Sequence, residues 1–455
     1  MNKSLSVSME LTTESPSHDT STMPMPPQAR VLLQMLRRIQ HGALRLTCPD
    51  GSVLQFGESD APVALRLNNW KPCMAAMKSG DIGFAESFIA GDWHTDDLTA
   101  LLQLLVRNRN ALEQAIYGSW WGGLLYRVRH LFNRNSKTGS RRNIHAHYDI
   151  GNAFYRLWLD PSMTYSSALF NHPGMSLQEA QQAKYARILS ELHVSEGARL
   201  LEIGCGWGGF AELATRNGMH MTGLTISTEQ LAFAEQRLQQ AGMAGRAELR
   251  LQDYRDVTGE FDGIASIEMF EAVGEQYWDS YFSTIAARLK SGAHACIQTI
   301  TIDDALFERY RKGSDFIQQY IFPGGMLPSP SVFRAHAERH GLEVVDAFAF
   351  GLDYARTLAQ WHLSFNAVLP EVRAQGFDSA SSAPGSFILR TARPASASTI
   401  SIYSSSHCAN RENRFDAIWR ASRAVAVAAV AVVTQCAADY VGDHAAYCSG
   451  ECCCG

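Results

Sequence analysis

The chain has 455 residues, of which 46% are hydrophobic and 19% charged, and its formal net charge is −5. This length predicts two or three domains with sizeable hydrophobic cores. The small net charge argues against a nucleic acid as the main partner, and no apolar run reaches the roughly 18–20 residues that a membrane-spanning helix needs. The N-terminus lacks the apolar core of a signal peptide, and most cysteines lie after residue 400, so we expect a reduced, cytoplasmic main body. The cysteine-rich end has no paired CxxC spacing, and we expect no metal site.

The first third of the chain is predicted to hold a leader, a small domain and a linker. Residues 1–27 are rich in Ser, Thr, Met and Pro, which is typical of a disordered leader. Residues 29–118 are predicted to form a small α+β domain, with strands at 43–47, 52–56 and 64–67 and helices at 75–90 and 98–109.

The stretch 119–146 combines Trp120 and Trp121 with many basic residues. It leaves two interpretations open, a patch that rests on an anionic membrane surface and a solvated linker between domains. Nucleic-acid binding is disfavoured because no groove helix or stacking sheet accompanies the patch.

Residues 147–378 are predicted to form an α/β domain. An aromatic and hydroxyl-rich stretch (147–170) and a helix (176–192) precede strands that alternate with helices. The predicted strands are 199–203, 219–224, 247–251, 261–267 and 293–299, and the helices are 207–217, 227–240 and 275–290. This alternation predicts a doubly wound parallel sheet covered by helices on both faces. Gly204, Thr225, Asp253 and Glu268 follow the ends of strands, where such sheets bind ligands.

The sequence E-x-G-x-G runs from Glu202 to Gly206, between a buried strand and a helix. Glycines allow a ligand close to the backbone, and the helix start offers free N–H groups. Gly204, Gly206 and Gly209 also match G-x-G-x-x-G, a weak dinucleotide signal. The next strand ends in Thr225-Ile226-Ser227, without the acidic residue that a nicotinamide dinucleotide requires. The loop resembles the S-adenosylmethionine loop of class I methyltransferases, and a turn that only packs a helix is the alternative.

Several ordered motifs together resemble the cyclopropane fatty-acid synthase family, which includes the mycolic-acid cyclopropane synthases. They are HYDIGN (147–152), MTYSSA (163–168), LEIGCGWGG (201–209), TGLTISTEQ (222–230), LQDYRD (251–256), MFEAVG (269–274), YIFPGG (320–325) and DYARTL (353–358). The resemblance covers about residues 30 to 378 and implies a class I methyltransferase (Rossmann-like) core behind a lipid-binding N-terminal domain. It implies transfer of a methylene group from S-adenosylmethionine to the cis double bond of an unsaturated phospholipid acyl chain, forming a cyclopropane fatty acid. It also implies peripheral contact with the inner membrane surface, and it leaves a homodimer open.

The resemblance, carried over by matching positions, implies two sets of site residues. Cofactor contacts would come from Tyr165, Ser166, Glu202, Gly204, Gly206, Thr225, Ile226, Gln230, Asp253 and Tyr254. A bicarbonate ion acts as the base in the family, and its cradle would be Ser167, Glu271, Gln298, Ile300 and Tyr354.

The chemistry that the resemblance implies needs dry walls, aromatic faces beside a carbocation and a positioned base. The aromatic density of residues 148–170 suits this need, although ordinary core packing explains more than half of these rings. The family usually has Cys where Ser167 stands and His where Gln298 stands. Both replacements can donate hydrogen bonds, but Gln cannot take up a proton, which weakens the case for bicarbonate more than that for methyl transfer. Formation of a methyl or methylene branch, and a non-catalytic lipid- or cofactor-binding role, are therefore open alternatives.

The resemblance ends abruptly after Asp378. Residues 379–455 are rich in Ser and Ala and then in Ala, Val and Cys, where the family continues with an aromatic helix. We interpret this tail as either a disordered extension or the product of a translational frameshift near residue 378, which would threaten activity. Resequencing the gene at this point distinguishes the two.

Overall fold

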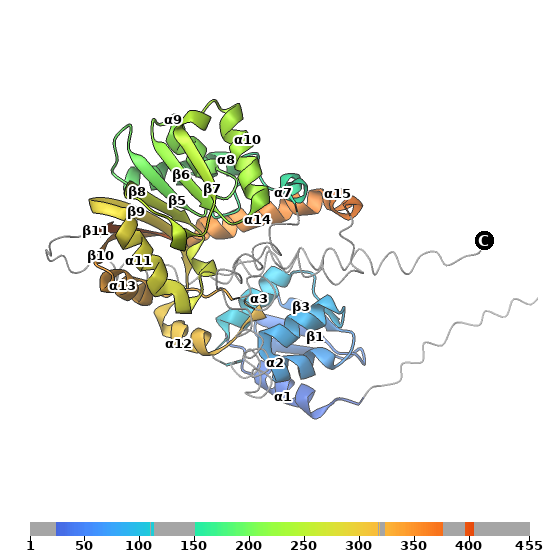
Figure 1. Cartoon of the computed structure of the whole chain (residues 1–455). Helices are drawn as coiled ribbons and strands as arrows, with labels where there is room; N and C mark the ends of the chain where they lie inside the picture. Colours follow the sequence, from blue (N-terminus) through green and yellow to red (C-terminus); the bar gives the residue numbers. More distant parts are fainter. Residues whose placement is uncertain are drawn as a thin grey trace, which may run out of the picture.

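The computed structural model describes residues 24–109, 111–112, 151–316, 318 and 324–375, and the backbone of 396–404 (Figure 1). The predictions for residues 1–23, for the aromatic and basic stretch 119–146 and for most of the tail lie outside the described residues. None of the helices in the described ranges is long and apolar enough to cross a membrane.

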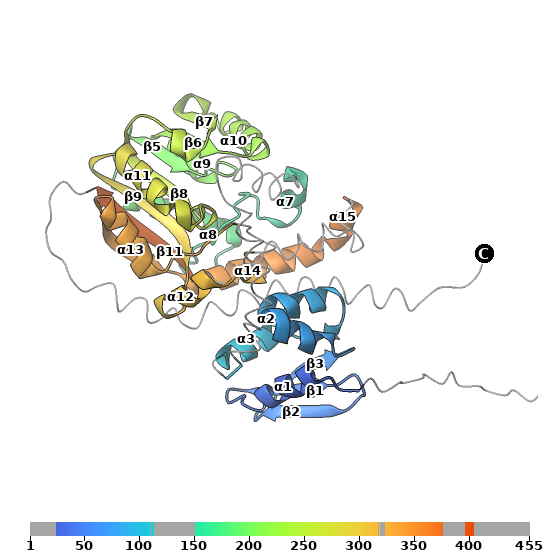
Figure 2. The same cartoon turned by 60° about the horizontal axis from the view of Figure 1, so that its bottom comes forward.

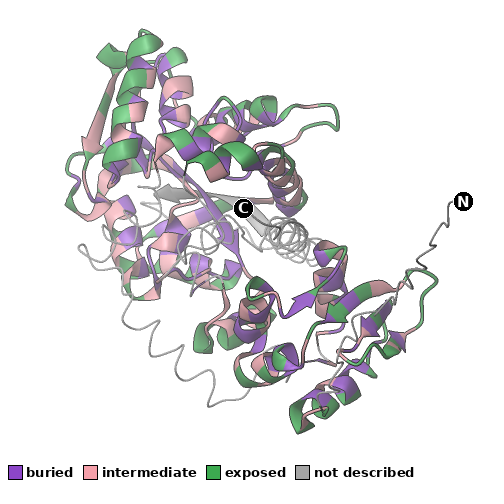
Figure 3. Cartoon of the chain, turned by 90° about the vertical axis from the view of Figure 1, so that its right-hand side faces the viewer, coloured by how far each residue is buried: buried purple, intermediate pink, exposed green. Residues whose placement is uncertain are grey.

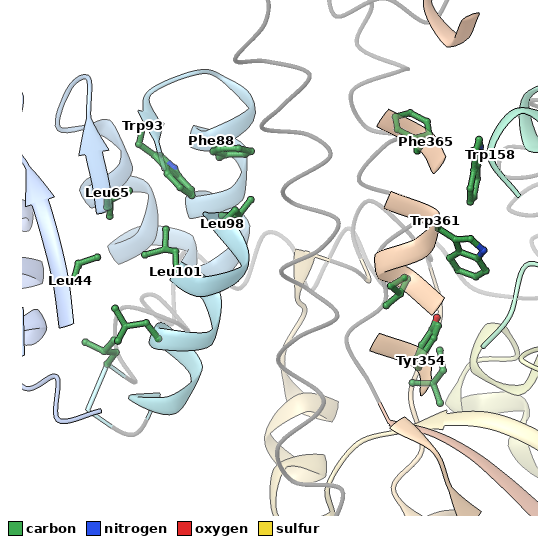
Figure 4. Packing of buried hydrophobic residues seen from close by; sticks show 14 of the residues in the cluster. Leu44, Leu65, Phe88, Trp93, Leu98, Leu101, Trp158, Tyr354, Trp361 and Phe365 are labelled. Carbon is green, nitrogen blue, oxygen red and sulfur yellow. The ribbon is translucent and has the colours of Figure 1, made fainter. Parts of the chain in front are cut away.

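The N-terminal domain is a four-stranded sheet with three helices. Its strands are β1 (Ala43–Thr47), β2 (Val53–Gly57), β3 (Val63–Leu67) and β4 (Trp93–His94), in the order β2-β1-β3-β4, and its helices are α1 (Pro27–Leu36), α2 (Lys71–Ile89) and α3 (Leu98–Arg107). The hairpin of β1 and β2 is antiparallel, and β1 pairs with β3 in parallel. Leu44, Leu65, Trp93 and Leu101 fill the core between the sheet and the helices (Figure 4). The three predicted strands lie within one residue of the observed ones, whereas the short β4 was not predicted.

The larger sheet has seven strands in the order β10-β11-β9-β8-β5-β6-β7. They are β5 (Arg199–Ile203), β6 (His220–Thr225), β7 (Ala247–Leu251), β8 (Phe261–Ile267), β9 (Leu289–Thr301), β10 (Leu342–Ala349) and β11 (Ser396–Ser404). The pairs β5–β6, β5–β8, β6–β7 and β8–β9 are parallel. The strand order reverses direction at β5, so the carboxyl end of β5 is the switch point at which such folds bind ligands.

Helices cover both faces of this sheet (Figures 1 and 2). On one face lie α8 (Leu177–Glu191), α9 (Gly209–Arg216) and α10 (Thr228–Gln240), which share a core containing Tyr185 and Phe210. On the other lie α11 (Trp278–Arg288) and α13 (Pro330–Arg339), whose core contains Trp278 and Phe333. Buried residues follow the strands, and exposed residues follow the outer faces of the helices (Figure 3). The predicted doubly wound α/β fold is confirmed.

Four further α-helices lie in the described part of the chain. The short α7 (Asn152–Trp158) packs against α14 (Gly351–Ala367), which continues into α15 (Leu369–Ala374). Helix α12 (Asp304–Lys312) follows β9 and packs against α13. Between β8 and α11 the chain makes two single-turn helices at 270–272 and 275–277.

Nine residues of the predicted atypical tail form a strand of this sheet. Strand β11 pairs antiparallel with both β9 and β10, with Ile400 opposite Ile297 on one side and Ala347 on the other. The sequence there alternates Thr399, Ile400, Ser401 and Ile402, which is typical of a strand. For residues 396–404 the structure therefore corrects the expectation of disorder, and the frameshift stays a prediction.

Candidate functional site

The glycine loop after β5 leaves open space at the start of α9. The N–H groups of Gly204 and Cys205 both donate to the Leu224 carbonyl of β6, at 3.0 and 2.8 Å, which turns the chain sharply. Gly204 and Gly206 have φ angles of 86° and 51°, a region that other residues rarely adopt. A Cβ atom added at Gly206 would meet no atom within 4 Å, so a ligand has room there.

The loop after β6 presents a pair of hydrogen-bonded polar side chains at the same edge. The Thr225 hydroxyl donates to Gln230 Oε1 at 3.0 Å, and both residues are buried. Ser227 caps α10 by accepting from the Gln230 N–H at 3.3 Å. Ile226 lies between them and is partly exposed, so the predicted cofactor residues Thr225, Ile226 and Gln230 come together.

The loop after β7 carries Asp253 and Tyr254. The Asp253 carboxylate binds the Arg255 guanidinium through two hydrogen bonds of 2.8 and 2.6 Å, which fixes its orientation. The ring of Tyr254 packs edge-on against Tyr281 at 5.7 Å between centroids. Both predicted residues lie at the carboxyl edge of the sheet, with Asp253 already paired within its own loop.

Two charged residues are buried beneath the glycine loop. Glu202, in β5, is 2% exposed, and its Oε2 atom has no hydrogen-bond partner within the described part of the chain. Burial raises the pKa of Glu202 to about 8, against the opposing effect of the Lys184 charge. Burial likewise lowers the pKa of Lys184 to about 7, and the carboxylates of Glu268, Asp160 and Glu202 oppose this. A buried acceptor beside open space suits a ligand that carries an ammonium group, as S-adenosylmethionine does.

Lys184 was missed by the sequence analysis. Its Nζ donates to Ser166 Oγ at 2.6 Å, and its side chain is 1% exposed. It stands between Ala180 and Ile188 on the buried stripe of α8, so a charged residue in an apolar helical pattern was the signal. Lys184 thereby links the predicted cofactor residue Ser166 to helix α8.

Aromatic rings surround Tyr165, the residue before Ser166. Tyr165 stacks on Trp361 of α14 at 5.3 Å, and Trp158 of α7 meets both rings edge-on at 5.9 and 6.0 Å. The indole N–H groups of Trp158 and Trp361 have no acceptor among the residues described. Trp158, Trp361 and Phe365 gather along α14 (Figure 4). Trp207 of the glycine loop joins this cluster through Tyr155 at 5.0 Å and donates from its Nε1 to Asn152.

A second cluster is built around two glutamates. Glu268 Oε1 accepts from the Ser167 N–H at 2.8 Å and from Gln298 Nε2 at 2.9 Å. Glu271 Oε1 accepts from the Ile300 N–H at 2.5 Å. Four of the five residues predicted to cradle the ion thus take part in two hydrogen-bonded groups, which are joined through Gln298 and Ile300 of β9.

Tyr354, the fifth predicted cradle residue, is buried on α14. One turn further along this helix, Thr357 Oγ1 accepts from the Ala168 N–H at 3.0 Å. This bond holds the helix against the stretch that carries Ser167, so Tyr354 lies in the same region of the molecule.

The cradle residues as arranged do not fit a bicarbonate ion. The Ser167 N–H and the Gln298 amide donate to Glu268, and the Ile300 N–H donates to Glu271. The Ser167 hydroxyl donates to the Ala168 carbonyl at 3.2 Å. An added anion would therefore compete with a carboxylate for each of the three N–H donors and would lie beside two like charges. Within the described ranges, no group of His, Cys, Asp or Glu side chains is arranged to hold a metal ion.

Comparison with known proteins places the chain in a family. Residues 135–383 match the family model described as mycolic acid cyclopropane synthetase. The chain is 35% identical over 363 residues to tuberculostearic acid methyltransferase UfaA1 of Mycobacterium tuberculosis, covering 77% of this chain and 84% of the relative. It is 34% identical over 318 residues to the cyclopropane-fatty-acyl-phospholipid synthase of Escherichia coli K12, covering 69% of this chain and 79% of the relative.

A solved structure agrees with this placement. The mycolic acid cyclopropane synthase CmaA1, complexed with SAH and CTAB, is 28% identical with a TM-score of 0.51, over 58% of this chain and 98% of that one. The fold is that of a class I methyltransferase, and the chain belongs to the mycolic acid cyclopropane synthetase family of S-adenosylmethionine-dependent enzymes.

Proposed function

We propose that this enzyme transfers a one-carbon unit from S-adenosylmethionine to the cis double bond of an unsaturated phospholipid acyl chain and forms a cyclopropane ring. The observation that carries the proposal is the stretch Tyr165–Ser167, which joins three parts of the site. Tyr165 belongs to the aromatic cluster with Trp158 and Trp361. Ser166 accepts a hydrogen bond from Lys184, and the Ser167 N–H donates to Glu268 in the cluster built around the two glutamates. Three neighbouring residues thus bring together the parts that alkene alkylation needs.

The cofactor residues fit S-adenosylmethionine by their chemistry. The space at Gly206 admits a ligand next to the backbone, and Glu202 offers a buried acceptor to its ammonium group. Glu202, Gly204, Gly206, Ser166, Thr225 and Gln230 would hold it, with Tyr254 beside the adenine. When bound, S-adenosylmethionine supplies an electrophilic methyl group at a sulfonium centre.

The aromatic cluster suits the next requirement of the reaction. An alkene that accepts a methyl group becomes a carbocation, which water would trap. The faces of Tyr165, Trp158 and Trp361 attract a positive charge by cation–π interaction, and their packing excludes water. Loss of a proton from the added carbon then closes the ring.

The substrate class follows from the relatives and from the need for an alkene. The Escherichia coli relative is named cyclopropane-fatty-acyl-phospholipid synthase, and the Mycobacterium tuberculosis relative is named tuberculostearic acid methyltransferase. The name of the Mycobacterium tuberculosis relative favours the alternative product, in which the same acyl chain carries a methyl or methylene branch in place of a ring. A methylene branch forms instead if a hydride first shifts from the methyl-bearing carbon to the cationic carbon and the added methyl carbon then loses a proton. A saturated methyl branch needs a reductant in addition. Action on phospholipid would place the enzyme in peripheral contact with the inner, cytoplasmic face of the membrane.

The test is release of S-adenosylhomocysteine in the presence of phospholipid vesicles. Vesicles of dioleoyl lipid should support release, and vesicles of saturated lipid of the same headgroup should not. Mass spectrometry of the acyl chains before and after hydrogenation under mild conditions then separates a ring, which persists, from a branched alkene, which is reduced. Binding of S-adenosylmethionine without lipid-dependent release would support instead a non-catalytic cofactor-binding role.

A further inference from the structure

Glu268 has a backbone conformation that non-glycine residues rarely adopt. Its φ angle is 47°, and it directly follows β8. Its N–H donates to the Gln298 carbonyl of β9 at 2.8 Å, which holds the backbone in place. Such strain persists only where the surrounding structure enforces it, and it concentrates at functional sites. The conformation therefore marks Glu268 as a candidate functional residue.

The Glu268 carboxylate occupies the donors that the family resemblance gives to bicarbonate. The Ser167 N–H and the Gln298 amide come from segments more than 100 residues apart, and both donate to Glu268 Oε1 at 2.8 and 2.9 Å. The carboxylate is thereby held by donors from two different parts of the domain. Gln298 suits this arrangement because its amide donates to the carboxylate without carrying a charge.

Glu268 is also the member of this cluster that can meet a ligand. Ser167, Gln298 and Ile300 are fully buried and Glu271 is 3% exposed, whereas Glu268 is partly exposed. The next residue along the chain, Met269, lies against the glycine loop, since a Cβ atom on Gly204 would come within 2.9 Å of its Cγ. Glu268 is therefore the chain neighbour of a residue that lies against the loop at which the cofactor is proposed to bind.

We propose that the Glu268 carboxylate is the resident proton acceptor of this enzyme, in place of a bicarbonate ion. The proposal rests on the proposed function. After transfer, the added methyl carbon carries three hydrogens and is bonded to one of the two former alkene carbons, and the other former alkene carbon is a carbocation. Glu268 takes one proton from that carbon, and the electrons of the broken C–H bond form the third side of the ring. The products are a neutral cyclopropane and a protonated Glu268, which returns its proton to water when the product leaves.

The test uses the full-length chain and three variants. Glu268→Gln keeps the size and the accepting oxygen but takes up no proton. Glu268→Gly removes the carboxylate and accommodates the positive φ. Glu260→Gln is the matched control, because Glu260 is exposed and stands at the opposite end of β8. Binding of S-adenosylhomocysteine and thermal unfolding establish that each variant is folded.

We expect wild-type activity on dioleoyl vesicles to be unchanged in carbonate-free buffer. The activity of Glu268→Gln should be about 100-fold or more below that of the wild type, as expected for loss of a general base, and the activity of Glu260→Gln should equal that of the wild type. Added bicarbonate or formate should restore part of the activity of Glu268→Gly. Independently of activity, carbon-13 NMR should show bicarbonate binding to Glu268→Gly and no binding to the wild type.

Three results would overturn the proposal. The first is a wild-type activity that falls when bicarbonate is removed and returns when it is added. The second is full activity of Glu268→Gln. The third is that labelled bicarbonate binds to the wild type but not to Glu268→Gly. A wild type that releases no S-adenosylhomocysteine with any lipid would refute the proposed function and the proton-acceptor role together. Even then, the NMR comparison decides separately whether the Glu268 carboxylate fills the place of the ion.

Discussion

Replacing Glu202 by Gln should stabilise the cofactor-free protein and weaken its binding of S-adenosylmethionine. Glu202 is 2% exposed, and its Oε2 atom has no partner within the described ranges. An ionised carboxylate in this position is stabilised by neither water nor a full set of donors. Gln has the same shape and carries no charge, so its amide oxygen binds a cationic ligand more weakly than a carboxylate does.

The magnitude follows from the pKa of Glu202, which burial raises from 4.5 to about 8. The folded protein holds this proton more tightly than the unfolded chain does, so ionisation costs stability. The cost is absent below pH 4.5, grows as the pH rises and is complete above about pH 8. At about 1.4 kcal/mol per tenfold change in proton affinity it reaches about 5 kcal/mol. Relaxation of the site reduces this, and we expect Glu202→Gln to gain about 1–3 kcal/mol near pH 8.

The assay is urea unfolding of both proteins near pH 5 and near pH 8, without ligand, followed by calorimetric titration with S-adenosylhomocysteine. The stability gain should be larger at the higher pH, and affinity should fall about 10- to 100-fold, the equivalent of one charged hydrogen bond. Glu260→Gln should change neither quantity. A variant that is less stable than the wild type near pH 8, or that binds the ligand equally well, would refute this account of Glu202.

Three further outcomes are expected. Lys184→Met should make the cofactor-free protein more stable near pH 7. Burial lowers the pKa of Lys184 to about 7, so between about pH 7 and pH 10 Lys184 is protonated in the unfolded chain and neutral in the folded protein. The stability of the wild type relative to Lys184→Met should therefore rise over this pH range in urea titrations. Tyr165→Leu should slow lipid-dependent release of S-adenosylhomocysteine about 10-fold, whereas Tyr165→Phe should stay near the wild-type rate because it keeps the ring. Ile400→Pro should cost about 3 kcal/mol or more in thermal unfolding, because β11 has a strand on each side. An unchanged melting temperature in that variant would show that the tail is not part of the sheet.

The architecture of the domain could be predicted because its elements obey simple periodicities. Leu200, Leu201 and Ile203, the glycine cluster and the helical spacing of Phe210 and Ala214 predicted a strand at 199–203, a turn and a helix at 207–217, and the observed helix spans Gly209–Arg216. Because parallel strands end at one edge, the residues at the ends of β5, β6, β7 and β8 were expected at the same edge of the sheet, and the parallel pairing of these strands places them there. The short β4 carries no pattern of its own, since two residues are too few to show alternation.

The interior of the site could not be predicted in the same way. Lys184 breaks an apolar stripe, but its donation to Ser166 depends on how α8 packs against a loop 18 residues away. The sequence placed Glu268 at the end of a strand without giving it a role, because only the folded chain brings Ser167 and Gln298 to its carboxylate. The tail was judged from composition alone, and composition does not show that β11 can insert between β9 and β10.

The most direct test of the central claim follows the methyl group itself. The purified chain is incubated with S-adenosylmethionine deuterated at the methyl group and with dioleoyl phospholipid vesicles, and the extracted acyl chains are analysed by mass spectrometry. The account predicts that the label enters the acyl chain and that the product keeps two of the three deuterium atoms, since Glu268 removes the third as the ring closes. Acyl chains that gain no label while S-adenosylhomocysteine still binds would contradict the assignment of an alkene-alkylating methyltransferase.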